Sequence, residues 1–455
     1  MRMALVISIM TVTIAWGQPR PVSIVNFSHL DHLMQDIQLG DQKVSIVHIY
    51  ADYPSYAWTD AGDEGISCVD DAARATIVFL KDFEFRRDSS SLSRACSLLK
   101  FLMFMQTNDG QFYNFIRADH SINRDGRTSV KSFGWWAGRG VWAMSLGCRV
   151  LKDIEPAFSK ELEQCVRRSF PNITSLLQKF GETESKNGFL MPKWLLYDSG
   201  SDATTELTLG LIEFYRATED EQVAEYIKDF ARGMMMMQDG DIKTYPYGAH
   251  RSWRTMWHSW GNSQSYALAY GGAVLSDTAM IASAEREAQG FYSRRLINGM
   301  LKEWDFSDPS SKIAYEQIAY GVRPMTLGLL QLYDVTHKEV YLKMAGLAAS
   351  WLFGNNVLGA IMYDSSTGRC FDGISDSTHL NRNSGAESTI EALLTLIELE
   401  RYPVALKYSK YKKVAVEESN EMLIGRFQDD SGHIIILTLD LKLGMVYSRD
   451  ASAQQ

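Results

Sequence analysis

Carboxylates stand at or near the start of several apolar segments of this sequence. Asp70 and Asp71 open "VDDAARATIVFL", Glu206 lies in "DATTELTLGL", Glu387 lies in "SGAESTIEALL", and Asp372 lies in the loop "RCFDG". Cleavage of a glycosidic bond needs two such groups. One protonates the leaving oxygen, and the other activates water or attacks carbon. The sequence therefore contains the acids for this reaction, provided that the fold brings them together.

An acid near the start of a helix also has a purely structural explanation. It accepts hydrogen bonds from the free N–H groups, and its negative charge interacts favourably with the positive end of the helix dipole. The stretch "SGAE" is a full capping box, and "SCVD" is close to one. Glu206 has Ala203 three residues before it, so capping does not explain it. We predict that Asp70 begins its helix. The expected catalytic set is Asp71, Glu206, Glu387, Asp372 and His258, with Glu206 and Glu387 favoured as acid and base.

Aromatic, amide and guanidinium side chains accompany these acids. The chain has 11 Trp, 21 Tyr and 20 Phe, and sugar rings stack on aromatic faces. Amides and guanidiniums fix hydroxyl positions by hydrogen bonds. The expected substrate-binding set is Asp70, Trp135, Trp136, Trp260, Asn262, Gln264, Tyr320, Arg323 and Asn383.

Two other functions fit the same residues. In a polysaccharide lyase, His258 or Tyr320 would remove a proton while Asn or Arg neutralised a uronate carboxylate. In a non-catalytic glycan-binding protein, sugars would bind but no two carboxylates would face each other. A glycoside hydrolase acting on a poly- or oligosaccharide remains the first expectation.

The elements that must position these residues form a repeat. Six helix-like stretches that are apolar nearly all round start at residues 67, 133, 202, 261, 319 and 383. Amphipathic helices are predicted between them, for example over 159–180, 220–237 and 283–304. Alternating buried and surface helices predict an all-α (α/α)6 toroid of six helical hairpins. The sixth outer helix is assigned to 28–37.

The pattern changes near residue 412. The runs "KVAVEE", "MLIGRF" and "HIIILTLDL" predict strands, and "KVSIVHIYADY" at 43–53 predicts another. We expect a barrel domain over 18–411 and a small C-terminal β-meander over 412–455.

The first 17 residues have the form of a signal peptide. Arg2 precedes an apolar segment, and "AWG" supplies small residues before a cut after Gly17. The expected location is secreted or periplasmic. The net charge of −9 and the lack of a basic run argue against a nucleic-acid partner. No later segment predicts a membrane span, and no His/Cys spacing predicts a metal site, so no cofactor is expected.

Several stretches resemble a known group of proteins. "GISCVDDAARA", "NDGQFYNF", "GRGVWAMSLG", "AYGVRPMTLGLLQLY", "FGNNVLGAIMYDSSTGRCFDGI" and "NRNSGAESTIEALL" are similar to bacterial six-hairpin glycosidase-like proteins, some found beside or fused to glycosyltransferases. The resemblance spans about residues 28–400 and implies an (α/α)6 fold, in a superfamily of glycoside hydrolases with epimerase and lyase relatives. The Trp-rich "AHRSWRTMWHSWGN" departs from the pattern, and an export signal stands in place of the fusion partner. The matching positions are Asp70, Asp71, Arg74, Asn355, Asp372, Asn383 and Glu387.

Overall fold

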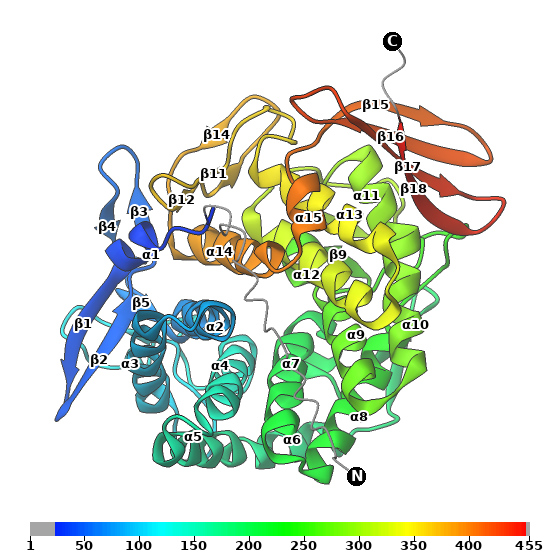
Figure 1. The fold of residues 1–455 in the computed structure, drawn as a ribbon. Coiled ribbons are helices and arrows are strands. Elements are labelled where there is room, and N and C mark those ends of the chain that lie inside the picture. The colour runs from blue at the N-terminus through cyan, green and yellow to red at the C-terminus, as the bar shows by residue number, and fades with distance from the viewer. Residues whose placement is uncertain (1–22, 452–455) are drawn as a thin grey trace, which may run out of the picture.

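Six helices form a closed ring of contacts in the computed structural model, which describes residues 23–451. Each contacts the next along the chain, and the last contacts the first (Figure 1). Each begins within or directly beside the apolar stretch predicted for it, because a helix without a polar face is buried. They are α2 (Val69–Arg86), α4 (Trp135–Leu151), α7 (Ser201–Thr218), α9 (Gln264–Leu275), α12 (Ala319–Thr336) and α14 (Ala386–Glu400).

A second set of helices lies outside this ring. Each inner helix contacts the outer helix that follows it in the chain. The segment predicted over 159–180 is two helices, since a new helix starts just before Pro171. The outer helices are α3 (Ser89–Met105), α5 (Pro156–Arg168), α6 (Phe170–Leu177), α8 (Glu221–Met236), α10 (Thr278–Glu287), α13 (Glu339–Ala349) and α15 (Pro403–Tyr408).

The helix predicted over 283–304 ends earlier than expected. After α10 the chain passes through one π-helical turn, η3 (Ala288–Tyr292), into α11 (Ser293–Asn298). Gly299 then adopts a φ of 114°, which ends the helix. The residues that follow form β10 (Glu303–Asp305), paired with β9 (Met256–His258).

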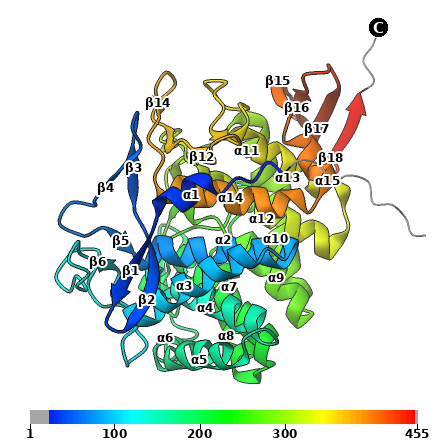
Figure 2. The same ribbon diagram turned by 60° about the vertical axis from the view of Figure 1, so that its left-hand side comes forward.

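The N-terminal segment is only partly the outer helix that was predicted over 28–37. Helix α1 (Ser28–Leu33) contacts α14, but the chain continues as β1 (Met34–Leu39), paired with β2 (Gln42–Val47). The β2 strand packs against α3 (Figure 2). The strand predicted over 43–53 is β2 and β3 (Tyr50–Asp52), the latter paired with β4 (Ala57–Thr59). The predicted signal peptide, 1–17, lies outside the described residues.

Short β-hairpins fill the links that lead into the inner helices. In one of them Asn187 and Gly188 adopt φ values of 52° and 84°, as expected for an Asn-Gly turn between paired strands. These hairpins fix the chain directly before the first turns of the ring. The hairpins are β7 (Thr183–Lys186) with β8 (Phe189–Pro192), β11 (Tyr363–Asp364) with β12 (Arg369–Cys370), and β13 (Gly373–Ile374) with β14 (Leu380–Asn381). Strand β5 (Ser67–Cys68) lies directly before α2 and pairs with β6 (Phe115–Ile116), which follows α3 in the chain.

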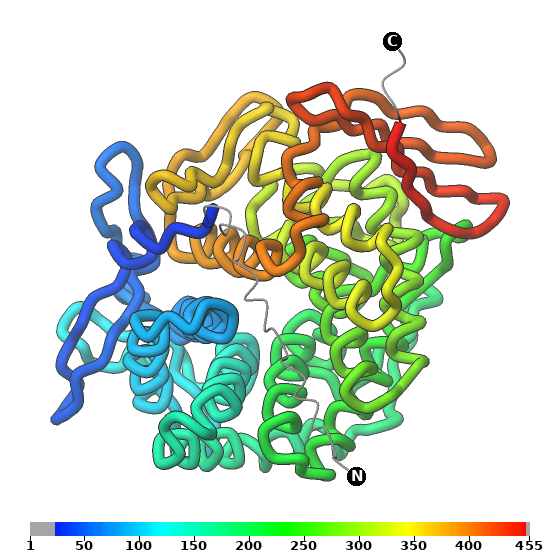
Figure 3. The backbone as a smooth tube through the Cα atoms, viewed as in Figure 1, coloured from blue at the N-terminus to red at the C-terminus, as the bar shows by residue number. Residues whose placement is uncertain are grey.

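The C-terminal strands form one antiparallel sheet in sequence order. The strands are β15 (Lys412–Glu418), β16 (Met422–Gln428), β17 (Ile434–Asp440) and β18 (Met445–Ala451). Phe427 and Leu437 are fully buried, and the sheet packs on α11 and α13. The tube in Figure 3 shows this red segment against the helices. Between residues 23 and 451, no helix has the length and apolarity that a bilayer crossing requires.

Candidate active site at the start of the inner helices

Charged side chains from α2, α4, α7, α12 and α14 meet near the first turns of these helices. Several of them are fully buried, and most are linked by ion pairs. In the described chain, five carboxylates surround three guanidiniums, so not every carboxylate has a cation of its own. We call this set the axial cluster: Asp70, Asp71, Arg74, Arg139, Glu206, Tyr320, Arg323, Glu387 and Glu391.

Arg74 joins the first and last inner helices. Its guanidinium donates to Asp71 at 2.6 Å, to Glu391 at 2.9 Å, and to Glu387 at 3.2 Å. Asp70 Oδ2 lies 3.6 Å from the same group. Arg74 is buried, and these four carboxylates hold its pKa well above the ordinary value against the effect of burial. The guanidinium is therefore a fixed cation between the acids.

Glu391 and Glu206 lie deeper in the cluster. Arg323 donates through Nε to Glu391 and through Nη2 to Glu206 at 3.3 Å. Glu206 is 1 % exposed, and Ser263 and Arg139 are its other polar neighbours. Glu206 is thus enclosed by cations and has no open path to a substrate.

Arg139 connects α2 to α12. It donates to the Asp70 carboxylate and to the Tyr320 hydroxyl, and its guanidinium lies over the Trp135 ring, 5.0 Å from the centroid. Asp70 keeps 24 % of its side chain exposed. The second oxygen of that carboxylate, Oδ1, has no hydrogen-bond partner among the described residues.

The acids of the cluster differ in pKa. Burial alone would raise the pKa of Asp70, but the charges of Arg139 and Arg74 outweigh it and hold that pKa below its ordinary value. For Glu387, desolvation prevails over Arg74 and raises the pKa, and Asp71 and Glu391 add to the rise. Burial also raises the pKa of Asp71. Glu387 is the most accessible of these acids, with 47 % of its side chain exposed.

His258 lies in a second pair of groups. Its Nε2 is 2.9 Å from Asp202 Oδ2, and its ring stacks on Trp260 with centroids 4.0 Å apart. The other ring nitrogen, Nδ1, has no partner among the described residues. Asp202 thus orients the imidazole, and this Nδ1 atom is buried.

Exposed aromatic side chains flank the axial cluster. The Tyr197 hydroxyl accepts the backbone N–H of Trp135, and Trp253 donates to the Tyr197 carbonyl at 3.4 Å. Tyr197 and Trp253 are 50 % and 39 % exposed. On another side, burial raises the pKa of Tyr50, and the negative charges of Asp71, Glu387 and Asp372 add to the rise. Rings therefore approach the acids from two directions.

Three other predicted residues make hydrogen bonds within the fold. Asp372 accepts from the Gly385 N–H at 2.8 Å and from Ser388 at 2.7 Å, so it caps α14 from a neighbouring loop. Trp136 donates to the Phe112 carbonyl, and Asn383 accepts from the backbone of Tyr53. Each of these side chains therefore has a hydrogen-bond partner within the fold.

Asn262 and Gln264 lie in a different buried cluster. Asn262 accepts from Trp257 at 2.7 Å and donates to Glu287 at 3.1 Å, and Gln264 donates to the Gly261 carbonyl. Both side chains are buried with their hydrogen bonds made internally. The structure does not bring them to the axial cluster.

Three residues of this region, Glu391, Asp202 and Tyr197, were not predicted from the sequence. Glu391 lies four residues after Glu387, one helical turn further along the same face. Asp202 lies in the first turn of α7, four residues before Glu206, a spacing that gives it the same face. Tyr197 has no signal, since it lies in a short 3₁₀ turn, η1 (Leu196–Asp198), with a φ of 55°. No set of three or more metal-ligating side chains suited to hold a metal occurs in residues 23–451.

The fold is found in solved structures of known proteins. No family model and no curated protein matches the sequence. A sugar epimerase from a ruminal bacterium matches with a TM-score of 0.57 and 13 % identity, over 81 % of this chain and 94 % of that one. The cellobiose 2-epimerase of Bacillus thermoamylovorans gives 0.54 and 13 %, over 77 % and 92 %. A D-mannose isomerase gives 0.54 and 11 %, over 78 % and 91 %. These proteins have the six-hairpin glycosidase-like fold, so the resemblance read from the sequence is confirmed at the level of the fold.

Proposed function

We propose that this protein is a carbohydrate-active enzyme that hydrolyses a glycosidic bond at the axial cluster, with Glu387 as the acid and Asp70 as the base. The observation that carries the proposal is the meeting of two partly exposed carboxylates, Asp70 and Glu387, at the guanidinium of Arg74. The opposite directions of their pKa shifts support it. Carboxylates whose environments separate their pKa values in this way take the acid and base roles in glycosidases.

The chemistry follows from the two protonation states. Glu387 holds its proton to a higher pH than an ordinary glutamate and donates it to the leaving oxygen. Asp70 stays ionised beside Arg139 and either attacks carbon or removes a proton from the attacking water. Their oxygens lie 3.3 and 3.6 Å from the same Arg74 nitrogen. These two oxygens are therefore at most about 6.9 Å apart, which suits the carboxyl separation of retaining glycosidases, about 5–5.5 Å, better than most of the inverting range, about 6.5–9.5 Å.

This assignment differs from the pair favoured on sequence grounds. Glu206 is 1 % exposed beneath two guanidiniums, and Asp71 is 4 % exposed with Arg74 and Cys68 on its oxygens. Neither reaches a substrate as Glu387 and Asp70 do. We assign Glu206 and Asp71 to holding the arginines in place. Trp135, Tyr197 and Trp253 are the side chains proposed to stack on sugar rings.

The proposal extends to the architecture and location of the chain. The closed ring of inner helices supports an (α/α)6 toroid over residues 18–411, with 412–455 as a C-terminal extension that packs on it. The epimerase and isomerase names of the structural neighbours support a carbohydrate substrate. Export by a signal peptide over 1–17 is proposed from the sequence alone.

A glycan panel tests the proposed reaction. The mature protein should release new reducing ends from one class of poly- or oligosaccharide, and Glu387→Gln and Asp70→Asn should each abolish the release. Glu421→Gln, an exposed glutamate at the C-terminal sheet, is the matched control and should retain full activity. Full activity of both Glu387→Gln and Asp70→Asn would overturn the assignment.

The His258–Asp202 pair favours a second candidate, proton transfer at a sugar carbon without hydrolysis. An imidazole oriented by a carboxylate suits a lyase, which is the alternative expected from the sequence, or an epimerase or isomerase. A lyase gives unsaturated uronates that absorb in the ultraviolet, and an epimerase changes a sugar without cleaving it. In either case His258→Gln would abolish turnover and Glu387→Gln would not. The hydrolase proposal expects the reverse ranking.

A further inference from the structure

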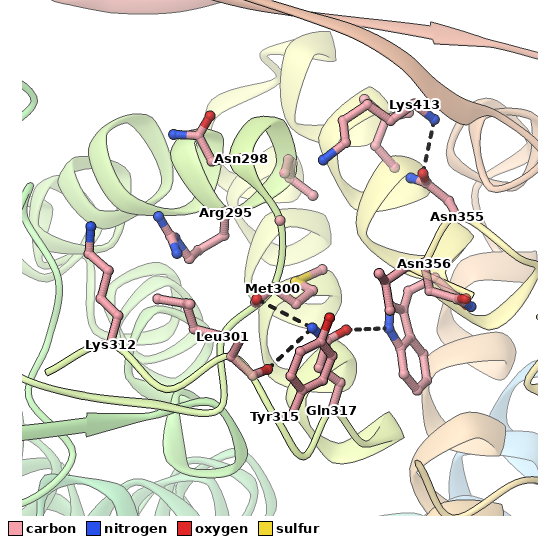
Figure 4. Close-up of a pocket in the computed structure, with 16 residues that line it drawn as sticks. Arg295, Asn298, Met300, Leu301, Lys312, Tyr315, Gln317, Asn355, Asn356 and Lys413 are labelled. Carbon is pink, nitrogen blue, oxygen red and sulfur yellow. Dashed lines mark hydrogen bonds between the residues drawn. The ribbon is translucent and has the colours of Figure 1, made fainter. Parts of the chain in front are cut away.

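A cavity of about 590 Å³ lies away from the axial cluster, between the barrel and the C-terminal sheet. It is bounded by α11, by the loop that precedes α12, by the chain after η4 (Ser350–Leu352), and by the start of β15 (Figure 4). None of its lining residues belongs to the predicted site set. A volume of this size is within the range of small-molecule sites, about 300–1,000 Å³.

Cations of three separate segments line this cavity. They are Arg295 of α11, Lys312 of the loop before α12, and Lys413 of β15 (Figure 4). None of the 16 lining residues, all within the described part of the chain, is acidic. In the part of the chain that the structure describes, no carboxylate forms an ion pair with Arg295, Lys312 or Lys413. By contrast, every guanidinium of the axial cluster has carboxylate partners.

Arg295 is the central cation. It is 7 % exposed, and its Nε has no hydrogen-bond partner among the described residues. Its guanidinium and the Lys312 ammonium both lie near the Trp304 ring, at 6.0 and 4.4 Å from the centroid. A buried guanidinium without a carboxylate costs stability unless another group compensates it.

The pKa values of both lysines are lowered beside this unbalanced positive charge. Burial lowers the pKa of Lys312 and of Lys413, and the positive charge of Arg295 lowers both further. Burial and Arg294 lower the pKa of Arg295 to about 10. Lys413 Nζ donates to the Ile297 carbonyl at 2.9 Å, which holds it at the cavity without neutralising it.

Amide side chains supply other polar groups of the cavity wall. Gln317 accepts from the Trp351 indole at 3.2 Å, and the Asn355 side chain accepts from the Lys413 backbone at 2.9 Å. These contacts hold the wall of the cavity rigid. The Asn298 amide extends on the same side as Arg295 in Figure 4.

We propose that this cavity binds a small anionic ligand, with a phosphate, sulfate or carboxylate group placed among Arg295, Lys312 and Lys413. A guanidinium binds such oxyanions through paired N–H donors, and the lysines add charge. The rest of the ligand lies along Tyr315. The site is independent of the proposed hydrolysis, because it shares no residue with the axial cluster.

Isothermal titration of the full-length mature protein tests the site with five probes: inorganic phosphate, inorganic sulfate, glucose 6-phosphate, glucuronate and glucose. At least one oxyanion should bind with 1:1 stoichiometry, and glucose should not. The double variant Lys312→Ala/Lys413→Ala should weaken that binding about tenfold or more, since each charged hydrogen bond lost is worth a factor of this order. The ranking of phosphate, sulfate and carboxylate probes identifies the ligand class.

Two matched variants complete the test. Lys410→Ala removes an exposed lysine outside the cavity and should leave binding unchanged. Glu387→Gln alters the axial cluster and should also leave it unchanged, which separates this site from the proposed catalytic one. Arg295→Gln should weaken binding most. Because Arg295 is buried, this variant can fail to fold, and the lysine double variant is then the deciding test. Absence of binding by every oxyanion, or equal binding by the double variant, would refute the proposal.

Discussion

Asp70 and Glu387 meet at one guanidinium: Arg74 Nη2 lies 3.6 Å from Asp70 Oδ2 and 3.3 Å from Glu387 Oε2. One acid comes from the first inner helix and the other from the last, so the contact between α2 and α14 brings them together. Arg139 donates a hydrogen bond to Asp70 and, with Arg74, outweighs the effect of burial on the Asp70 pKa. For Glu387 the effect of burial prevails, and Asp71 and Glu391 add to it, so the pKa values of the two acids shift in opposite directions.

The roles of the two acids predict different responses to the leaving group. Glu387→Gln removes the proton donor, so it should lower kcat by about 100- to 10,000-fold on a natural glycoside. The loss should be much smaller on an aryl glycoside whose phenol leaves without protonation. Asp70→Asn should lose activity on both substrates, because activation of the nucleophile is still required. Steady-state rates of the three proteins on both substrates check this, and an equal loss for both variants on the aryl glycoside would contradict the assignment.

The pH dependence of kcat/KM should be bell-shaped with an acidic optimum. Activity needs Asp70 ionised and Glu387 protonated. As the pH falls through the lowered pKa of Asp70, the base is lost; as it rises through the raised pKa of Glu387, the acid is lost. Arg139→Met removes a cation beside Asp70, so the acidic limb should move to higher pH while the alkaline limb moves less. An alkaline limb that persists in Glu387→Gln would assign that limb to another group.

Replacing Glu391 should lower the free energy of unfolding more than replacing any other carboxylate of the axial cluster. This glutamate is fully buried between Arg74 and Arg323, so Glu391→Gln leaves two guanidiniums short of a counter-charge. We expect a loss of ~3–5 kcal/mol in the free energy of unfolding, measured by urea denaturation. Glu387→Gln, at the half-exposed end of the same helix, should cost no more than about 1 kcal/mol. Similar losses for the two variants would show that the buried network adds little.

His29 should make the protein less stable in mild acid. Its Nε2 is 2.8 Å from the Ser384 carbonyl, beside the start of α14, and burial lowers its pKa to about 4 against that hydrogen bond. The unfolded chain takes up a proton near an ordinary histidine pKa of about 6.5, while the folded chain does not do so until about pH 4. Stability therefore falls as the pH drops from about 6.5 to 4, by up to ~3 kcal/mol from this group. Urea unfolding at about pH 7 and about pH 4.5 should show a smaller difference for His29→Gln than for the wild type. An identical difference in both proteins would assign the acid sensitivity to other groups.

The inner helices are the part of the fold that the sequence predicts best. Stretches such as the one around Glu206 are apolar on all sides, and only a buried helix suits that pattern. The segment at 28–37 was harder, because hydrophobic positions in α1 and β1 read as one amphipathic helix. Its strand half depends on pairing with β2, which local pattern does not reveal.

Part of the placement of the acids in the candidate site follows from the sequence. Asp70, Asp71 and Glu387 lie near the starts of α2 and α14 and share one guanidinium, but Cys68 rather than Asp70 caps α2. The burial of Glu206 depends on which way α7 is rotated about its own axis, and the internal hydrogen bonds of Asn262 depend on how the link before α9 packs. Both are set by packing with neighbours distant in the chain. The cavity that we propose as an anion site was not predicted, because its three cations, Arg295, Lys312 and Lys413, come from segments that share no motif.

The ring closes only where α14 reaches α2. During synthesis, Arg74 leaves the ribosome long before Glu387 and Glu391, which are its partners on the last inner helix. A nascent chain that lacks α14 therefore contains a cation that is buried in the finished protein but still without those two counter-ions. The proposed acid does not yet exist in such an intermediate. A fragment that stops short of residue 386 should accordingly be inactive, because it lacks both the proposed acid and the helix that closes the ring.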